Sequence, residues 1–104
     1  MVNILWWSVL VLITKKVVNI KNKVLVELIV PEIDKTYQIY LPINKKIGNI
    51  INLLNEAIFE LSNGELPQSK SNSLYNVDTL EMYLSDKLLI NTNIRNGTRL
   101  VLIS

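Results

Sequence analysis

The chain of 104 residues contains no cysteine and no histidine. It therefore has no disulfide framework and no thiolate nucleophile, and it lacks the usual ligands of zinc and non-haem iron. The commonest general base of enzymes is also missing, so acid–base catalysis would have to use carboxylates, lysine, tyrosine or serine. These absences favour a protein that is not an enzyme and that uses no metal and no other cofactor.

Glycine occurs only three times, which leaves little room for a phosphate-binding glycine loop. Charge of one sign is not in large excess either, because 11 Lys and Arg are interleaved with 9 Asp and Glu. No dense basic stripe with interleaved aromatic residues occurs, so we expect no nucleic-acid binding. About half of the residues are apolar (49%), which is enough for one hydrophobic core in a single domain of this length.

The chain opens on an uncharged apolar run, residues 2–14, which Lys15 and Lys16 follow. The run is shorter than the about 20 residues that cross a bilayer. A secretory signal carries its positive charge before the apolar core, not after it. Three interpretations stay open: an added strand or short helix on the domain, an interfacial membrane anchor, or a non-native extension. In the second, Trp6 and Trp7 lie at the lipid headgroups and the two lysines lie in water.

Two runs of alternating apolar residues, 24–30 and 36–41, predict two β-strands. Pro31 follows the first run and lacks the N–H that a further ladder bond needs, and Pro42 follows the second. The connection between the runs is so short that it allows only an antiparallel hairpin. The chain beyond residue 23 therefore begins with a hairpin.

Residues 45–61 have apolar side chains at the spacing of one helix face. We expect Asn44 to cap the amino end of this helix and Asn63-Gly64 to end it. The residues of the apolar stripe are Ile47, Ile50, Ile51, Leu54, Ile58 and Leu61.

The remainder of the chain predicts short strands at 74–77 and 80–84, a coil or 3₁₀ turn at 88–94, and a last strand at 98–103. The order strand, strand, helix and strands is that of an α+β β-grasp fold. We expect a mixed sheet of four to five strands packed on one helix, with the last strand lying between the hairpin and the other strands.

The core spacing resembles that of ubiquitin over residues 24–104, which leaves residues 1–23 as an apolar and basic amino-terminal extension. The resemblance lies in two sets of spacings. One is the number of residues from the end of the second strand to the buried residues of the helix, and the other is the number between the buried residues near the chain end. It implies a ubiquitin-like domain that works by binding other proteins. The residues that hold these spacings are Leu41, Ile47, Ile50 and Leu54, and later Leu89, Ile94 and Leu100.

Two stretches also resemble the YukD/EsaB family, small ubiquitin-like proteins associated with type VII secretion in Gram-positive bacteria. One is L-P-I-N-K-K-I-G-N-I-I from Leu41, and the other is D-K-L-L-I-N-T-N-I-R-N-G-T-R-L-V-L-I from Asp86. The resemblance implies a cytoplasmic accessory or regulatory protein with type VII secretion components as partners. The apolar amino-terminal run departs from the soluble family members, so a membrane-linked structural module with contact through residues 2–16 stays an alternative. The residues that fit the family ending I-x-x-G-D/T-x-L-x-L are Ile94, Gly97, Leu100 and Leu102.

Conjugated ubiquitin-like proteins and sulfur carriers end in Gly-Gly, because a flexible tail must enter the adenylating enzyme. The present sequence ends L-V-L-I-S at Ser104. We therefore expect neither conjugation nor sulfur transfer, and a modifier or sulfur carrier is the less favoured alternative.

The sheet face turned away from the helix is unusually apolar for a solvated surface. A partner surface needs an apolar centre with a polar rim, and Tyr and Arg are favoured contact residues. Two other interpretations stay open: the amino-terminal run folds back over this face, or its apolar residues are ordinary scattered exposure. The face should carry Leu25, Glu27, Ile29, Gln38, Tyr40, Arg99, Val101 and Ile103. The candidates for protein contact among them are Leu25, Ile29, Gln38, Tyr40, Arg99 and Val101.

Two groups of like-charged residues are explained without a binding site. The lysines at 15, 16, 21 and 23 form a loose basic cluster that could touch anionic lipid, although a solvated linker is the favoured interpretation. Asp78, Glu81 and Asp86 form a loose acidic group. No glycine-bearing calcium loop surrounds it, so we expect it to be a solvated surface.

Overall fold

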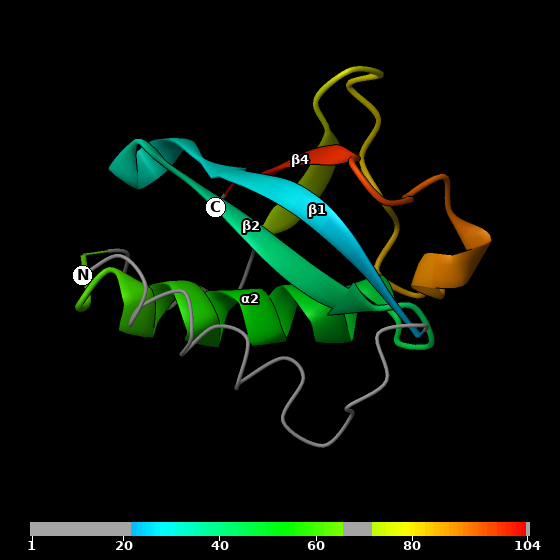
Figure 1. Ribbon diagram of the computed structural model, residues 1–104, viewed down its shortest axis with the longest axis horizontal. Coiled ribbons are helices and arrows are strands. Elements are labelled where there is room, and N and C mark those ends of the chain that lie inside the picture. Colours follow the sequence, from blue (N-terminus) through cyan, green and yellow to red (C-terminus); the bar gives the residue numbers. More distant parts are fainter. Residues whose placement is uncertain (1–21, 66–71, 104) are drawn as a thin grey trace.

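The computed structural model describes residues 22–65 and 72–103, and all element bounds below refer to this part of the chain (Figure 1). The predictions for Trp6, Trp7, Lys15 and Lys16 lie outside the described residues. None of the described helices is long and apolar enough to cross a membrane. The strands are β1 (Lys23–Val30), β2 (Lys35–Pro42), β3 (Ser73–Asn76) and β4 (Arg99–Ile103), and the helices are α2 (Ile47–Leu61) and the 3₁₀ helices η2 (Pro31–Ile33) and η3 (Leu89–Asn91).

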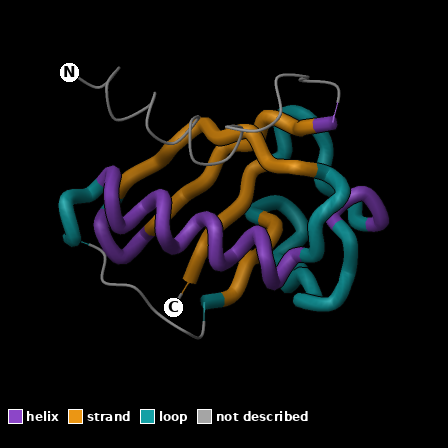
Figure 2. Tube along the Cα trace, turned by 90° about the horizontal axis from the view of Figure 1, so that it is seen from below, coloured by secondary structure: helices purple, strands orange, loops and turns teal. Residues whose placement is uncertain are grey.

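The four strands form one mixed sheet in the order β2-β1-β4-β3. Strand β1 is antiparallel to β2 and parallel to β4, and β4 is antiparallel to β3. Helix α2 lies across one face of this sheet (Figure 2). The predicted α+β, ubiquitin-like β-grasp is confirmed with four strands, and the last strand does lie between the hairpin and β3.

The core lies between α2 and the inward side of the sheet. Strand β1 alternates as predicted, because its inward valines and leucine are buried while the residues between them are half-buried. Complete burial of a Leu or Ile side chain contributes roughly 1.5–3 kcal/mol, so this stripe fixes how the helix sits on the sheet. The residues of α2 with no exposed area are Ile47, Ile50, Leu54, Ala57 and Ile58.

The start of the helix differs from the prediction. Residues 45 and 46 are not helical, and α2 begins at Ile47. The residue at the N-cap position is Lys46, without a side-chain capping bond, so the predicted cap by Asn44 is wrong.

The loop before η3 supplies the missing acceptors. The N–H of Ile47 donates to the carbonyl oxygen of Lys87 (2.8 Å), and the N–H of Gly48 donates to that of Ser85 (2.9 Å). A free helix N–H needs an acceptor, but the acceptor need not come from a capping residue. A Cβ at Gly48 would lie 3.3 Å from the Ser85 carbonyl oxygen, so glycine allows this close approach.

The predicted strand at residues 80–84 is also wrong. Only an isolated bridge joins Tyr75 to Met82, and Leu80 has the left-handed φ of 63°. The side-chain oxygen of Asn76 accepts from the N–H groups of Asp78 and Thr79 (2.8 and 3.0 Å), which turns the chain directly after β3. The turn brings residues 81–83 back beside β3, where the N–H of Asn76 donates to the carbonyl oxygen of Glu81 and the N–H of Tyr83 donates to that of Leu74, both at 2.9 Å.

A polar network holds this turn against the core. The Asn76 side-chain amide donates to the Tyr83 hydroxyl (2.9 Å), which donates to the side-chain oxygen of Asn93 (2.5 Å). Tyr83 is buried, and burial raises the pKa of its phenol. The hydrogen bond from Asn76 works against this rise in pKa, and the charge of Glu81 adds to it.

We expect Leu54→Ala to lower the free energy of unfolding by about 2–5 kcal/mol, because it opens a cavity at the centre of the core. Leu54 has no exposed area. Urea unfolding measures the change, and Asn52→Ala on the exposed side of α2 is the control. The control should change stability by less than about 0.5 kcal/mol. Equal effects of the two substitutions would contradict the packing described here.

We expect stability to fall at alkaline pH. The folded-state pKa of Tyr83 is raised by burial, and that of Tyr37 is raised by burial and by the charge of Glu65. Unfolded tyrosine has a pKa of about 10, so full stability is present below that pH and is lost as pH rises through the folded-state pKa values. Urea unfolding at a series of pH values above 8 measures the loss.

The variant Tyr83→Phe distinguishes the contribution of Tyr83 to the alkaline loss of stability from that of Tyr37. At neutral pH it should cost about 1–2 kcal/mol, because its hydrogen-bond partners Asn76 and Asn93 lose the hydroxyl. Its alkaline loss should be smaller than that of the wild type, since only Tyr37 still titrates with a raised pKa. An unchanged alkaline slope in this variant would show that Tyr83 is not the group responsible.

Candidate functional site

The outer face, defined as the side of the sheet turned away from α2, collects all six predicted protein-contact residues. Across the β1–β2 pairing, Tyr40 lies opposite Leu25 and Gln38 lies opposite Glu27. Across the β1–β4 pairing, Arg99 lies beside Glu27 and Val101 lies beside Ile29. The register places these side chains on one surface, and their role in binding stays a prediction.

An apolar row crosses this face. Ile29 of β1 lies beside Val101 of β4, which in turn lies opposite Tyr75 of β3. All three side chains are half-buried, as are Leu25 and Tyr40 two rows away. Directly opposed residues on adjacent strands have their Cβ atoms about 4.5–5.5 Å apart, so the row forms a continuous apolar strip.

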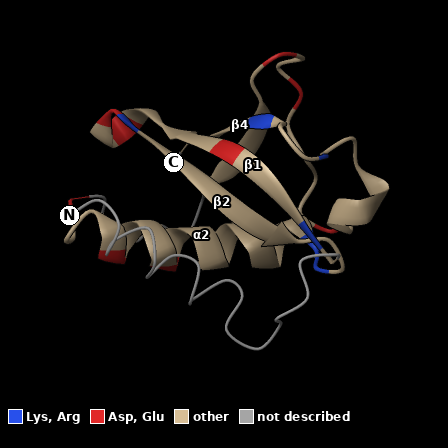
Figure 3. Ribbon diagram, in the orientation of Figure 1, with Lys and Arg blue, Asp and Glu red and all other residues tan. Residues whose placement is uncertain are grey.

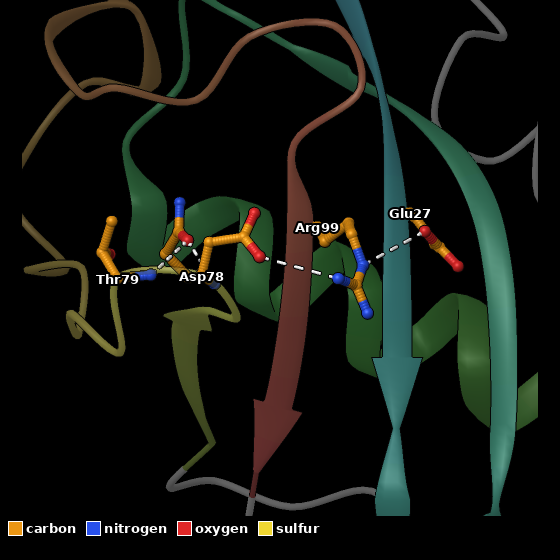
Figure 4. Close-up of polar contacts among 5 residues, drawn as sticks. Glu27, Asp78, Thr79 and Arg99 are labelled. Carbon is orange, nitrogen blue, oxygen red and sulfur yellow. Dashed lines mark hydrogen bonds and ion pairs between the residues drawn. The ribbon is translucent and has the colours of Figure 1, made fainter.

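A charged row lies between the apolar strip and the Leu25–Tyr40 pair. The Nε atom of Arg99 is 3.6 Å from Oε1 of Glu27, and its Nη1 atom is 3.6 Å from Oδ1 of Asp78. Figure 4 shows the guanidinium between the two carboxylates. The three side chains are 48%, 39% and 69% exposed, so each pair contributes at most about 1 kcal/mol to stability. The pairs instead restrict the positions that Arg99 can take on the surface.

Local backbone geometry brings Asp78 to Arg99. The N–H of Val77 donates to the carbonyl oxygen of Arg99 (3.0 Å), which extends the β3–β4 pairing by one residue. The turn formed by the Asn76 side chain then begins. The sequence grouped Asp78 with Glu81 and Asp86, whereas the structure pairs it with Arg99. No cluster of three or more potential metal ligands occurs in residues 22–65 and 72–103.

The outer face ends in an open depression beside Tyr40. Its wall is formed by the turn before β4, where Gly97 has a φ of 89°. The N–H of Leu25 donates to the side-chain oxygen of Asn96, and the N–H of Gly97 donates to the carbonyl oxygen of Leu25, both at 2.8 Å. The lining residues are Leu25, Val26, Glu27, Gln38, Tyr40, Asn96 and Gly97.

Sequence reasoning missed three residues of this face: Tyr75, Asp78 and Asn96. Tyr75 alternates with buried Leu74 and Asn76 and therefore points outward. Asn96 precedes Gly97 in a pair typical of a turn, and that pattern alone gives its side chain no partner. The alternation in β3 was a usable signal, whereas the pairings of Asp78 and Asn96 depend on register.

Sequence comparison finds no matching family model and no significantly similar curated protein. Solved structures with the same fold are found at low identity. A chain of the MycP5-free ESX-5 inner membrane complex in state II has a TM-score of 0.64 and 18% identity. The match covers 78% of the present chain and 20% of that chain, so the present chain corresponds to about a fifth of its length.

Two further structures show the same likeness. A ubiquitin-like domain of an Arabidopsis thaliana protein matches with a TM-score of 0.54 and 18% identity, covering 79% of the present chain and 77% of the domain. A chain of the toluene 4-monooxygenase HD complex with the inhibitor 4-bromobenzoate matches with a TM-score of 0.60 and 7% identity. That match covers 77% of the present chain and 95% of the other. Residues 22–65 and 72–103 thus have the ubiquitin-like β-grasp fold.

Proposed function

We propose that this chain is a non-enzymatic, ubiquitin-like protein-interaction module. It serves a bacterial type VII secretion system as an accessory or regulatory component on the cytoplasmic side, and it is related to the YukD/EsaB group. The observation that carries this proposal is the outer face, where an apolar strip and an ion-paired arginine share one surface.

The chemistry of the outer face suits a protein partner. Ile29, Val101 and Tyr75 offer a continuous apolar strip over three strands, which is the centre that a partner surface needs. Tyr40 and Arg99 are residue types that dominate binding energy in interfaces. Because Glu27 and Asp78 restrict the Arg99 side chain, less conformational freedom is lost when a partner contacts it.

Two lines of support connect this module to type VII secretion. One is the resemblance of the chain ending to the YukD/EsaB ending. The other is the fold shared with a chain of the ESX-5 inner membrane complex, which is a type VII system. In that complex the matched region is a small part of a longer chain. The likeness supports a module that works within a larger assembly of proteins.

Affinity capture from the source organism tests the proposal. Tyr40→Asp places a charge in the depression of the outer face, and Asn52→Asp places the same charge on the exposed side of α2. We expect wild type and Asn52→Asp to recover a protein of the secretion complex, identified by mass spectrometry. Tyr40→Asp should recover it at least about tenfold less, which corresponds to about 1.4 kcal/mol of binding energy.

Arg99→Ala provides a second test of the same face, because the exposed side chain can be removed without opening the core. Thermal unfolding of each variant verifies that it is folded. If both outer-face variants recover the same partners as wild type, the outer face is not the binding surface. If none of the recovered proteins belongs to a secretion complex, the assignment to type VII secretion is wrong.

A further inference from the structure

Charge is unevenly distributed over the described part of the chain. We define the basic end by the charged residues at the start of β1, in the β2–α2 connection and in the loop before η3. These are Lys23, Lys45, Lys46 and Lys87, together with Asp86. The basic end therefore carries a net charge of +3, whereas the other described residues include three basic and eight acidic side chains and carry −5. In Figure 3, basic residues gather at the end of the sheet where β1 starts.

Backbone contacts hold the lysine-bearing segments together. The N–H of Leu89 donates to the carbonyl oxygen of Lys45 (2.9 Å), and Lys46 forms an isolated bridge with Leu88. The carbonyl oxygen of Lys87 accepts from the N–H of Ile47 (2.8 Å). The lysines of two segments that lie far apart in sequence are thus fixed side by side.

The first described residue joins the same end. The N–H of Ile43 donates to the carbonyl oxygen of Asn22 (3.1 Å), and the N–H of Ile90 donates to the carbonyl oxygen of Ile43 (3.0 Å). Residues 1–21 therefore connect to the described domain at the basic end. Their sequence contains Lys15, Lys16 and Lys21 and no acidic residue.

The basic end keeps a net positive charge although it includes Asp86. Arg99, by contrast, lies at the middle of the sheet and is paired with Glu27 and Asp78. Lys23 is itself 6% exposed, and this burial lowers the pKa of its ammonium group, as does the nearby charge of Lys45. A surface with this field attracts anions.

Two exposed aliphatic residues belong to the segment that follows Lys87. Leu88 follows Lys87 directly and is 37% exposed, and Ile90 is 50% exposed. Both sit in the segment that the contacts to Ile43 and Lys45 fix in place. Aliphatic side chains bordered by lysines are the composition of segments that enter the headgroup region of a bilayer.

We propose that the basic end docks on the surface of an anionic lipid bilayer. The exposed lysines Lys45, Lys46 and Lys87 contact the headgroups, and Leu88 and Ile90 enter the interface between headgroups and acyl chains. Residues 1–21, which join the domain at this end, have the same combination of lysines and apolar residues. An acidic protein would satisfy the lysines as well, but the exposed leucine and isoleucine and the apolar run at 2–14 favour lipid. The docking surface uses different side chains from the outer face, and the two adjoin where the Leu25–Tyr40 pair lies two residues from Lys23 along β1.

Sedimentation of the full chain with vesicles tests this proposal. The vesicles contain phosphatidylglycerol and phosphatidylcholine in equal parts, and vesicles of phosphatidylcholine alone are the comparison. Lys46→Glu lies in the basic end, and Lys35→Glu, at the start of β2, is the matched control with the same change of charge. Both lysines are exposed, and a glutamate at the amino end of α2 favours the helix, so the fold is retained.

We expect Lys46→Glu to weaken binding to the anionic vesicles about tenfold or more, since it removes one attractive charge and adds a repulsive one. Lys35→Glu should bind the anionic vesicles within about twofold of wild type, because Lys35 lies away from the docking surface and its charge is screened at that distance. The double variant Leu88→Ser, Ile90→Ser should also bind less, while its binding keeps its dependence on salt. The same comparisons in a Trp6→Ser, Trp7→Ser background prevent lipid insertion of residues 2–14 from masking the effect.

Three results would overturn the proposal: equal losses for Lys46→Glu and Lys35→Glu, no loss for either, or equal binding to neutral and anionic vesicles. Failure to bind vesicles, together with binding of polyglutamate that Lys46→Glu abolishes, would assign the basic end to an acidic protein instead. A protein partner lost with Tyr40→Asp but retained with Lys46→Glu would leave the outer-face proposal standing in any of these cases.

Discussion

The parallel pairing of β4 with β1 is the constraint on which the other features depend. A parallel neighbour cannot follow through a tight hairpin, so the chain must cross the sheet between the two strands. Helix α2 lies in this crossing and covers one face, and β3 lies on the far side of β4. The same pairing sets Arg99 beside Glu27 and Val101 beside Ile29. Core, outer face and charged row therefore follow from one register, and a slip by one residue would exchange the buried and exposed sides of β4.

The sequence predicts well those helices and strands whose apolar residues recur at a regular spacing. Alternation is a property of one strand and the apolar stripe is a property of one helix, so β1, β2, β4 and the body of α2 could be located without knowing their neighbours. The start of α2 could not, because its acceptors come from Ser85 and Lys87, far along the chain. The supposed strand at 80–84 failed for a related reason. Its apolar residues suit a strand, but after the turn at Asn76 it meets β3 through the Tyr75–Met82 bridge alone, and that extent of pairing depends on the neighbouring strand.

The alternation within each strand predicts which residues lie on the outer face. The polar contacts between those residues depend on the register between strands. The Asp78–Arg99 pair and the Asn96–Leu25 hydrogen bond join residues whose proximity no local pattern encodes. The residues that carry the YukD/EsaB resemblance have structural tasks here: Ile94, Leu100 and Leu102 are buried, and Gly97 takes a positive φ. The motif therefore reports the fold directly, and it bears on the partner only through the family resemblance. The partner has to be inferred from the exposed residues, which the motif does not include.

The outer face and the basic end use different side chains, and salt screening separates the basic end from the acidic residues farther along the molecule. At physiological ionic strength a charge is screened within about 8 Å, whereas the molecule extends over 34 × 30 × 22 Å. A bilayer near the basic end therefore acts mainly on its net charge of +3 and only weakly on the −5 of the other described residues. A turn of the molecule that brings the acidic residues to the headgroups is repelled. Charge separation thus selects one orientation at the membrane, and in that orientation β1 leads away from the bilayer, from Lys23 toward the apolar strip at Ile29.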